Sequence, residues 1–257
     1  MMNDSFPPGA VLVVGGSGGI GQAVATEFAR SGTDVALTYR GKREVAEQVA
    51  AGIRSLGRRA SIHQLTIGDR ERCESVVSEA ADIHRRLHTI VVGAGTLAQP
   101  VRIADMTVGQ WRTVIDQDLD GFYNILQATL HRMKGWGGGS YVHLGSVGHL
   151  LWPERDVLSV APKAAIEALI TGIAREEGRF NIRANSVLVG VIEAGMFLEL
   201  SRQGAFDQQW IEDVQKTLAL KRWGAPEEVA HACVFLASSR ALYVTGQRIA
   251  VAGGYGV

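Results

Sequence analysis

The feature that most constrains how this chain folds is a regular alternation of short apolar runs with longer amphipathic stretches. Runs that are apolar at every position are typical of strands buried on both faces of a parallel sheet, and amphipathic stretches are typical of the helices that cover it. The pattern predicts strands at residues 10–14, 34–39, 61–66, 89–92, 141–144, 182–189 and 248–251. It predicts helices at residues 19–30, 43–56, 70–86, 107–133, 160–179 and 227–237.

This order of elements predicts an α/β fold with a doubly wound, Rossmann-like parallel sheet. We expect one domain of residues 10–257 after a short lead of residues 1–9, because 257 residues are at the upper end of what one hydrophobic core supports. In such a sheet, ligands bind at the carboxyl ends of the strands. The glycine-rich and polar motifs of the chain all fall at those ends.

The charge balance argues against several classes of partner. Lys plus Arg and Asp plus Glu each number 26, so no field of one sign favours nucleic acid or an anionic membrane. We find no apolar run of the ~20 residues that a membrane span needs, and residues 1–9 do not resemble a signal peptide. Cys73 and Cys233 are far apart and lack metal-ligand spacing, so we expect buried free thiols, no metal site and a cytoplasmic location.

A glycine-rich turn, GGSGGIG at residues 15–21, joins the first predicted strand to the first predicted helix. Glycine permits positive φ and lets the backbone approach a pyrophosphate, while the helix N-terminus supplies amide donors and the positive end of its dipole. Tight turns also use glycine, so the turn alone is weak evidence. Its place directly after an apolar strand favours nucleotide binding over a purely structural turn.

The end of the second predicted strand bears on the choice between NAD and NADP. An acidic residue about 20 positions past the glycines would bind the ribose 2′-hydroxyl of NAD. The sequence there is TYRGKR at residues 38–43, with no acidic residue before Glu44. A guanidinium suits a 2′-phosphate, so we expect NADP(H), with Arg40 and Ser17 at that phosphate, and consider NAD the less favoured cofactor. The alternative is an exposed basic loop.

Several motifs resemble those of the short-chain dehydrogenase/reductase family. Residues 15–21 are similar to its TGxxxGIG signature, with Val14 in place of the threonine, and VGAG at residues 92–95 lines up with NNAG. GSVG at residues 145–148 looks like the strand end that carries the catalytic serine. IRAN at residues 182–185 is similar to the IRVN strand, and residues 246–254 resemble the closing GQxIxVxGG. The likeness covers nearly the whole chain in order.

The resemblance implies a nicotinamide dinucleotide and a set of residues around it. The resemblance implies that Ser146 orients the substrate carbonyl and that Lys163 holds the nicotinamide ribose. The tyrosine of the family's YxxxK motif belongs at position 159, where this chain has serine. Val189-Gly190 replaces a proline-glycine pair and Ala194 replaces a threonine, so the departures gather at the nicotinamide end. The implied cofactor contacts are Gly15, Ser17, Gly19, Ile20, Gly21, Arg40, Thr66, Ile67, Gly93, Ala94, Gly95, Lys163 and Ile192.

Serine at position 159 changes the expected chemistry. A phenol has a pKa near 10 that a neighbouring ammonium lowers, whereas an aliphatic hydroxyl is a far weaker acid. Loss of acid–base help costs about 10²–10⁴-fold in rate. Pro162 suits only the first turn of a helix, so we favour Ser159 as the N-cap of a helix that begins near Val160 over a catalytic Ser159. Lys163 either contacts the cofactor or pairs with Glu167 one turn later.

Asp118 is a candidate replacement for the missing acid. Thr107 and Gln110 predict a capping box for the helix at 107–133, and Asp118 lies on its apolar face, where the family has an asparagine. A carboxylate there needs a partner or a raised pKa. One interpretation is a proton relay from Asp118 through Lys163 or water, and the other is a buried ion pair between the two.

Two further acids lie in the loop between Ser146 and Ser159. His149 and Asp156 could each supply protons in place of the tyrosine, although a lone loop histidine is more often solvated. The segment 195–223, which corresponds to the family's substrate lid, is rich in apolar and aromatic residues. It suggests an apolar or acyl-type small-molecule substrate, or else aromatic packing on the core.

The leading interpretation is an NADP(H)-dependent oxidoreductase that acts on a carbonyl or alcohol with an altered proton donor. A non-catalytic relative that binds dinucleotide, as a sensor or partner subunit, is the main alternative. A dehydratase or isomerase on the same pocket is the third. The resemblance also implies a homotetramer assembled through the helices at 107–133 and 160–179.

Overall fold

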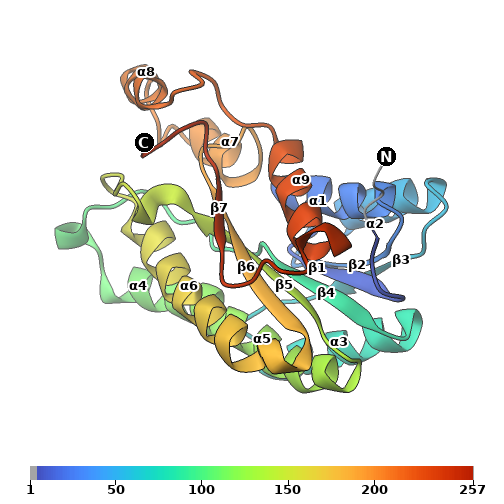
Figure 1. Ribbon diagram of the computed structural model, residues 1–257. Coiled ribbons are helices and arrows are strands. Elements are labelled where there is room, and N and C mark those ends of the chain that lie inside the picture. The colour runs from blue at the N-terminus through green and yellow to red at the C-terminus, as the bar shows by residue number, and fades with distance from the viewer. Residues whose placement is uncertain (1–4, 257) are drawn as a thin grey trace.

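Seven parallel strands form the centre of the molecule, and helices cover both faces of the sheet (Figure 1). The computed structural model describes residues 5–256. Its strands are β1 (Ala10–Val14), β2 (Asp34–Tyr39), β3 (Ala60–Gln64), β4 (Leu87–Val92), β5 (Gly139–Ser146), β6 (Ile182–Val189) and β7 (Arg248–Val251). They lie in the order β3-β2-β1-β4-β5-β6-β7, so the direction of winding reverses between β1 and β4. This confirms the predicted doubly wound, Rossmann-like α/β fold.

The helices divide between the two faces. Helices α1 (Gly19–Arg30), α2 (Arg43–Ser55) and α9 (Pro226–Ala237) cover one face. The other is covered by α3 (Arg70–His84), α5 (Asp120–Gly135) and α6 (Val157–Glu177), with α4 (Val108–Val114) beside them. Successive residues of β1 alternate between two apolar clusters, Val11 and Val13 in one and Leu12 and Val14 in the other. A strand buried on both faces is a nearly continuous apolar run, which is why the sequence pattern predicts β1.

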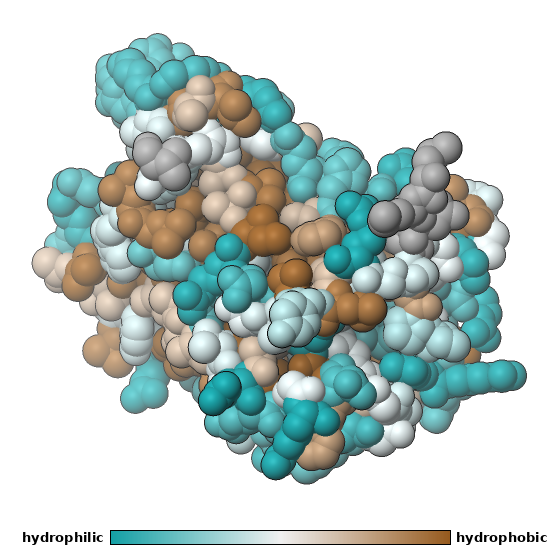
Figure 2. Space-filling view, viewed as in Figure 1, coloured by the Kyte–Doolittle hydropathy of each residue, from teal (hydrophilic) through white to brown (hydrophobic). Residues whose placement is uncertain are grey.

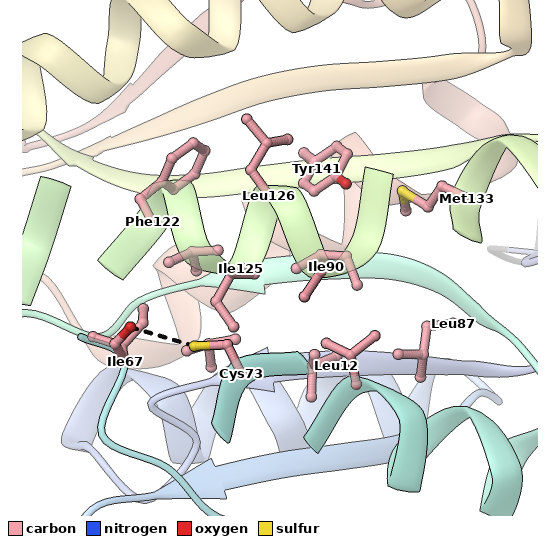
Figure 3. Packing of buried hydrophobic residues seen from close by; sticks show 14 of the residues in the cluster. Leu12, Ile67, Cys73, Leu87, Ile90, Phe122, Ile125, Leu126, Met133 and Tyr141 are labelled. Carbon is pink, nitrogen blue, oxygen red and sulfur yellow. Dashed lines mark hydrogen bonds between the residues drawn. The ribbon is translucent and has the colours of Figure 1, made fainter. Parts of the chain in front are cut away.

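A buried apolar core lies between α5 and the sheet (Figure 3). Helix α5 contributes Phe122, Ile125 and Leu126 to this core. They belong to the same buried cluster as Ile90 of β4 and Tyr141 of β5. Both cysteines are buried and free, as predicted. Burial raises the pKa of the Cys73 thiol to about 12, so this group stays protonated and unreactive at neutral pH.

Several element boundaries differ from those predicted. The helix expected at 107–133 begins with the predicted capping box of Thr107 and Gln110, but a π-helical turn (Ile115–Leu119) separates α4 from α5. Strands β4 and β5 extend beyond the predicted 89–92 and 141–144, because their main-chain pairing with β1 and β6 continues past the predicted runs. The segment 195–223 contains helices α7 (Gly195–Arg202) and α8 (Gln208–Thr217), which form a separate lobe above the strand ends (Figure 1).

The structure bears on two expectations, the N-terminal lead and the membrane-spanning segments. Of the predicted lead, residues 1–4 lie outside the described residues, while Phe6 packs against Phe28 and His88 with ring centroids 5.6 and 5.4 Å apart. Among the described residues, one helical stretch, Val157–Phe180, is long and apolar enough to cross a membrane by length and composition. Half of its apolar window is buried inside the fold. This burial is typical of a central helix of a globular domain.

Acid is expected to destabilise the fold through His88. Burial lowers the pKa of His88 to about 3 from 6.5, and its ring nitrogens bond to Thr33 and Thr89 at 2.7 and 2.9 Å. Because the unfolded chain binds the proton more tightly, this contribution is complete above pH 6.5 and is lost as pH falls toward 3. At about pH 4.5 the loss is about 3 kcal/mol, or roughly 6–12 °C in Tm. Thermal melts from pH 7 to 4.5 should show this fall, and a His88→Asn variant should show a shallower dependence; parallel curves would contradict the assignment.

Candidate functional site

A first cavity forms where β1 turns into α1. Gly15 has φ of +88°, and its N–H donates to Thr38 Oγ1 at the end of β2 (2.9 Å). A Cβ on Gly21 would meet the Gly15 carbonyl oxygen, and a Cβ on Gly19 would meet the backbone of Gly195 at the start of α7. Helix α1 begins at Gly19 with no side chain that caps its amide groups. The turn therefore requires glycine, and it leaves helix N–H groups available to an anion.

This glycine-loop cavity has a volume of about 450 Å³. Arg40 and Lys42 line it beyond the end of β2, and Asp118 is the one carboxylate among the described residues that line it. Thr66 does not line it: its side chain is exposed, whereas Leu65 and Ile67 on either side are buried and face the cavity. The predicted cofactor contacts that the cavity brings together are Gly15, Ser17, Gly19, Ile20, Gly21, Arg40, Ile67, Gly93, Ala94 and Gly95.

A second cavity, of about 460 Å³, adjoins the first beyond the ends of β5 and β6. We call it the apolar cavity, since aliphatic and aromatic side chains form most of its wall. Its lining includes Ser146, Ser159, Lys163 and Ile192, all of which the sequence had singled out. The two cavities share Ile20, Gly93, Ala94, Gly95 and Met196, so they meet at the ends of β1 and β4.

The start of α6 differs from the prediction. The helix begins at Val157, and the N–H groups of Ser159 and Val160 both donate to the carbonyl of Asp156, at 3.0 and 2.9 Å. The N-cap position therefore belongs to Asp156, and the prediction that Ser159 caps the helix is wrong. Pro162 is buried inside α6, where its missing N–H removes one main-chain hydrogen bond. Ser159 consequently lies in the first turn and faces the apolar cavity.

Lys163 contacts this serine. Its Nζ donates to Ser159 Oγ (3.2 Å) and to the Ser159 carbonyl (3.3 Å). The alternative pairing with Glu167 is wrong, because that carboxylate is buried and bonds to His143 Nδ1 (2.9 Å) and Arg248 Nε (3.0 Å). The pKa of Glu167 is lowered by these partners in spite of its burial. The ammonium of Lys163 thus stays at the cavity rather than in the core.

Ser146 completes the polar side of the apolar cavity. It ends β5, and its Oγ accepts a hydrogen bond from the Gly148 N–H (3.0 Å). This bond uses a lone pair of the hydroxyl and leaves its O–H free to donate toward the cavity. Serine and lysine therefore present one donor and one cation to the same space.

Asp118 lies in the π-helical turn between α4 and α5, and its side chain is buried. Such turns in long helices occur frequently at functional sites. Asp118 Oδ1 accepts hydrogen bonds from both the N–H and the Oγ1 of Thr96, each at 2.8 Å. These bonds replace the predicted ion pair with Lys163, which is wrong, and they satisfy the carboxylate at the neighbouring glycine-loop cavity.

The two loop acids have different surroundings. His149 is half-buried, and its Nδ1 is buried without a hydrogen-bond partner among the described residues. It lines neither cavity, so it does not reach the candidate site. Asp156 lines the apolar cavity. Burial raises the pKa of Asp156 to about 6, against the opposing effect of the Lys163 charge.

The lobe of α7 and α8 forms the outer wall of the apolar cavity. Phe197, Phe206, Trp210 and Trp223 form an aromatic cluster in which the Phe206 and Trp210 rings stack with centroids 4.0 Å apart. Figure 2 shows the apolar surface gathered beneath this lobe, between it and the body of the molecule. The aromatic residues therefore pack on one another, as one of the two expectations for this segment had it, and Phe197, Phe206 and Trp210 also line the apolar cavity.

One functional candidate of this site, Tyr255, is not indicated by any of the sequence motifs. Tyr255 lines the apolar cavity from the C-terminal end of the chain, after the positive-φ pair Gly253 and Gly254. The predicted closing motif ended at Gly254, one residue too early. Only the return of the chain past the strand ends places this phenol beside Asp156, whose charge contributes with burial to a raised Tyr255 pKa.

Comparison with known proteins bears on this arrangement. Residues 14–256 match the family model described as enoyl-(acyl carrier protein) reductase. The chain is 33% identical over 245 residues to a 3-oxoacyl-[acyl-carrier-protein] reductase of Aggregatibacter actinomycetemcomitans, covering 95% of this chain and 98% of the relative. It is 34% identical to an L-rhamnose 1-dehydrogenase (NAD(P)(+)) of a Sphingomonas species, covering 95% and 94%.

Solved structures agree with these relatives. A short-chain type dehydrogenase/reductase from Mycobacterium ulcerans superimposes with a TM-score of 0.91 at 27% identity, covering 98% of this chain and 91% of that one. Family model, relatives and structures all extend over nearly the whole chain. The chain belongs to the short-chain dehydrogenase/reductase family of oxidoreductases.

Proposed function

We propose that this protein is an NADP(H)-dependent oxidoreductase that interconverts a carbonyl and an alcohol, with a proton donor other than a tyrosine at position 159. The observation that carries the proposal is the junction of the two cavities at Gly93, Ala94 and Gly95. A dinucleotide anchored at the glycine loop would extend toward this junction, and Ser146 and Lys163 line the apolar cavity beyond it. The named activities of the two relatives, a reductase and a dehydrogenase, support the same reaction class.

The residues present fit a nicotinamide dinucleotide. The glycine cradle would be filled by a Cβ at Gly19 or Gly21, and Arg40 adds a cation beyond it. When bound, the reduced cofactor supplies a hydride. Ser146 then donates its free O–H to the substrate carbonyl, and Lys163 places a positive charge near the oxygen that becomes negative, which stabilises the transition state.

The test is direct binding followed by turnover. The protein should bind NADPH, seen as a change in nicotinamide fluorescence, and should oxidise it in the presence of 3-oxoacyl thioesters or aliphatic ketones. Failure to bind either pyridine nucleotide at millimolar concentration would refute the enzymatic proposal and leave only the fold.

Replacing Arg40 by alanine is expected to weaken NADPH binding about 10–100-fold and to leave NADH binding nearly unchanged, because only NADPH carries the 2′-phosphate that a guanidinium recognises. Ser17 is buried at the same cavity and supports this position for the phosphate. Arg54→Ala is the matched control, since that guanidinium bonds to the Ala60 carbonyl at the far end of α2. Titrations with both nucleotides measure the effect; equal losses for NADPH and NADH would exclude this role.

We also propose an apolar or acyl-type substrate. Phe197, Leu200, Phe206 and Trp210 line the apolar cavity, so a chain of methylene groups gains by leaving water there. The rate constant kcat/KM should rise with acyl chain length until the cavity is filled. A preference for short polar sugars would contradict this substrate class.

Ser159 favours one alternative, a dinucleotide-binding relative without catalysis that acts as a sensor or partner subunit. Its hydroxyl bonds to Lys163 and is too weak an acid to replace a phenol. Tight NADPH binding without turnover over a broad carbonyl panel would favour this alternative.

Two broader expectations belong to the proposal. One is a homotetramer assembled through α4, α5 and α6, as the resemblance to the family implies. Sedimentation analysis of the purified protein would measure it. The buried free thiols of Cys73 and Cys233 are consistent with a cytoplasmic location.

A further inference from the structure

The first turn of α6 presents a carboxyl group to the apolar cavity. Asp156, Ser159 and Lys163 are spaced three and four residues apart, which places them along one face of the helix, and all three line the cavity. Asp156 occupies the N-cap position, yet its side chain does not cap the helix. Within residues 5–256, no hydrogen bond or ion pair involves its carboxylate. The group is therefore free to bond to a ligand.

The surroundings of Asp156 suit proton transfer near neutral pH. Burial raises its pKa to about 6, and the facing charge is the Lys163 ammonium, which opposes the rise. Tyr255 faces it from the C-terminal segment. Glu154 and Arg155 of the preceding loop also line the cavity, but their side chains bond to Arg102 (3.0 Å) and to the Pro100 carbonyl (3.2 Å). An acid with a pKa close to the working pH both donates and regains a proton efficiently.

We propose that Asp156 is the proton donor of carbonyl reduction in this protein, an inference that rests on the proposed oxidoreductase function. The carbonyl carbon accepts the hydride, the π-bond electron pair moves to the oxygen, and that oxygen takes the proton of the Asp156 carboxyl group. Asp156 is left as a carboxylate and regains a proton from solvent, to which it is partly exposed. In alcohol oxidation the carboxylate accepts the hydroxyl proton.

Two neighbouring hydroxyl groups are less suitable. Ser159 is a very weak acid, and its oxygen accepts a hydrogen bond from Lys163. The pKa of the Tyr255 phenol is raised by burial and by the Asp156 charge, so it holds its proton more tightly than an ordinary tyrosine. Asp156 is the strongest of the three acids that face the cavity.

The first test needs neither cofactor nor substrate. Infrared difference spectra of the ligand-free protein report the C=O stretch of protonated carboxyl groups as the pH is changed. We expect a carboxyl group that titrates near pH 6 in the wild type and in Asp105→Asn, an exposed control, and is absent from Asp156→Asn. Loss of the same band in the control, or its persistence in Asp156→Asn, would overturn the assignment.

The second test is kinetic. Asp156→Asn is expected to lower kcat about 10²–10⁴-fold without changing the Kd of NADPH, and Asp156→Glu to recover part of the rate. Full activity of Asp156→Asn in an active wild-type background overturns this inference and leaves the proposed function intact. The inference is also overturned if Tyr255→Phe loses activity while Asp156→Asn keeps it, because the phenol would then be the proton donor. An inert wild type overturns both the function and the inference.

Discussion

Replacement of Gly19 by valine is expected to weaken dinucleotide binding by about 10²–10⁴-fold. A Cβ at this position meets the backbone of Gly195, and the larger side chain also fills the space between the glycine loop and α7. Two charge-assisted hydrogen bonds between helix amides and a pyrophosphate contribute about 3–6 kcal/mol, which corresponds to that range of affinity. Fluorescence titration with NADPH measures the change.

A matched control separates binding from stability. Gly52→Ala lies on α2, where an added methyl group meets no atom within 4 Å, and it should keep wild-type affinity with equal or higher Tm. Circular dichroism and Tm of both variants show whether the fold is intact. A folded Gly19→Val variant with wild-type affinity would show that the pyrophosphate does not bind at this turn.

Replacing Lys163 by methionine is expected to lower kcat/KM by about 10²–10³-fold, the usual cost of removing one donor that stabilises an oxyanion. Methionine keeps most of the length of the side chain but removes the charge that lies beside Ser159. Lys216→Met on α8, where the ammonium pairs with Asp213 at 3.0 Å on the surface, is the control and should keep its activity. Steady-state kinetics with NADPH and the best substrate of the panel measure the effect.

The same variant links Lys163 to Asp156. Under the proposed mechanism, reduction needs protonated Asp156, so activity should fall as pH rises through the pKa of this group, which is about 6. The Lys163 charge lowers that pKa. Its removal should therefore shift the falling limb of the pH–rate profile to higher pH. An unshifted limb would show that another group controls the reaction.

The fold follows closely from the order of residues along the chain. A strand buried on both faces is mostly apolar, as β1 is throughout. The predicted bounds of β1, β2 and β6 agree with the structure, although β2 and β6 also contain polar residues such as Asp34 and Asn185. The glycine turn and the basic residues after β2 are local features, because both depend on short stretches of backbone that follow a strand.

Tertiary structure decided the partners of the charged groups. From the sequence, both Asp118 and Glu167 were possible ion-pair partners of Lys163. In the structure, Asp118 in the π-helical turn bonds to Thr96 instead. Glu167 bonds to His143 of β5 and Arg248 of β7. Helical spacing defines which residues share a face, whereas the partner of a buried charge depends on elements distant in the chain.

The candidate site, too, depends partly on local sequence and partly on tertiary structure. Ser146, Ser159 and Lys163 could be named from motif spacing alone, since each lies at a strand end or in the helix that follows. Asp156 was named only as one of two loop residues that could supply protons. Its free carboxyl group and raised pKa could not be predicted, because they arise from burial in a cavity that α6, the α7–α8 lobe and the C-terminal segment close together. The sequence by itself determined the sheet and the glycine loop, whose causes are local; the tertiary structure decided which acid faces the substrate space, because desolvation is a property of the assembled molecule.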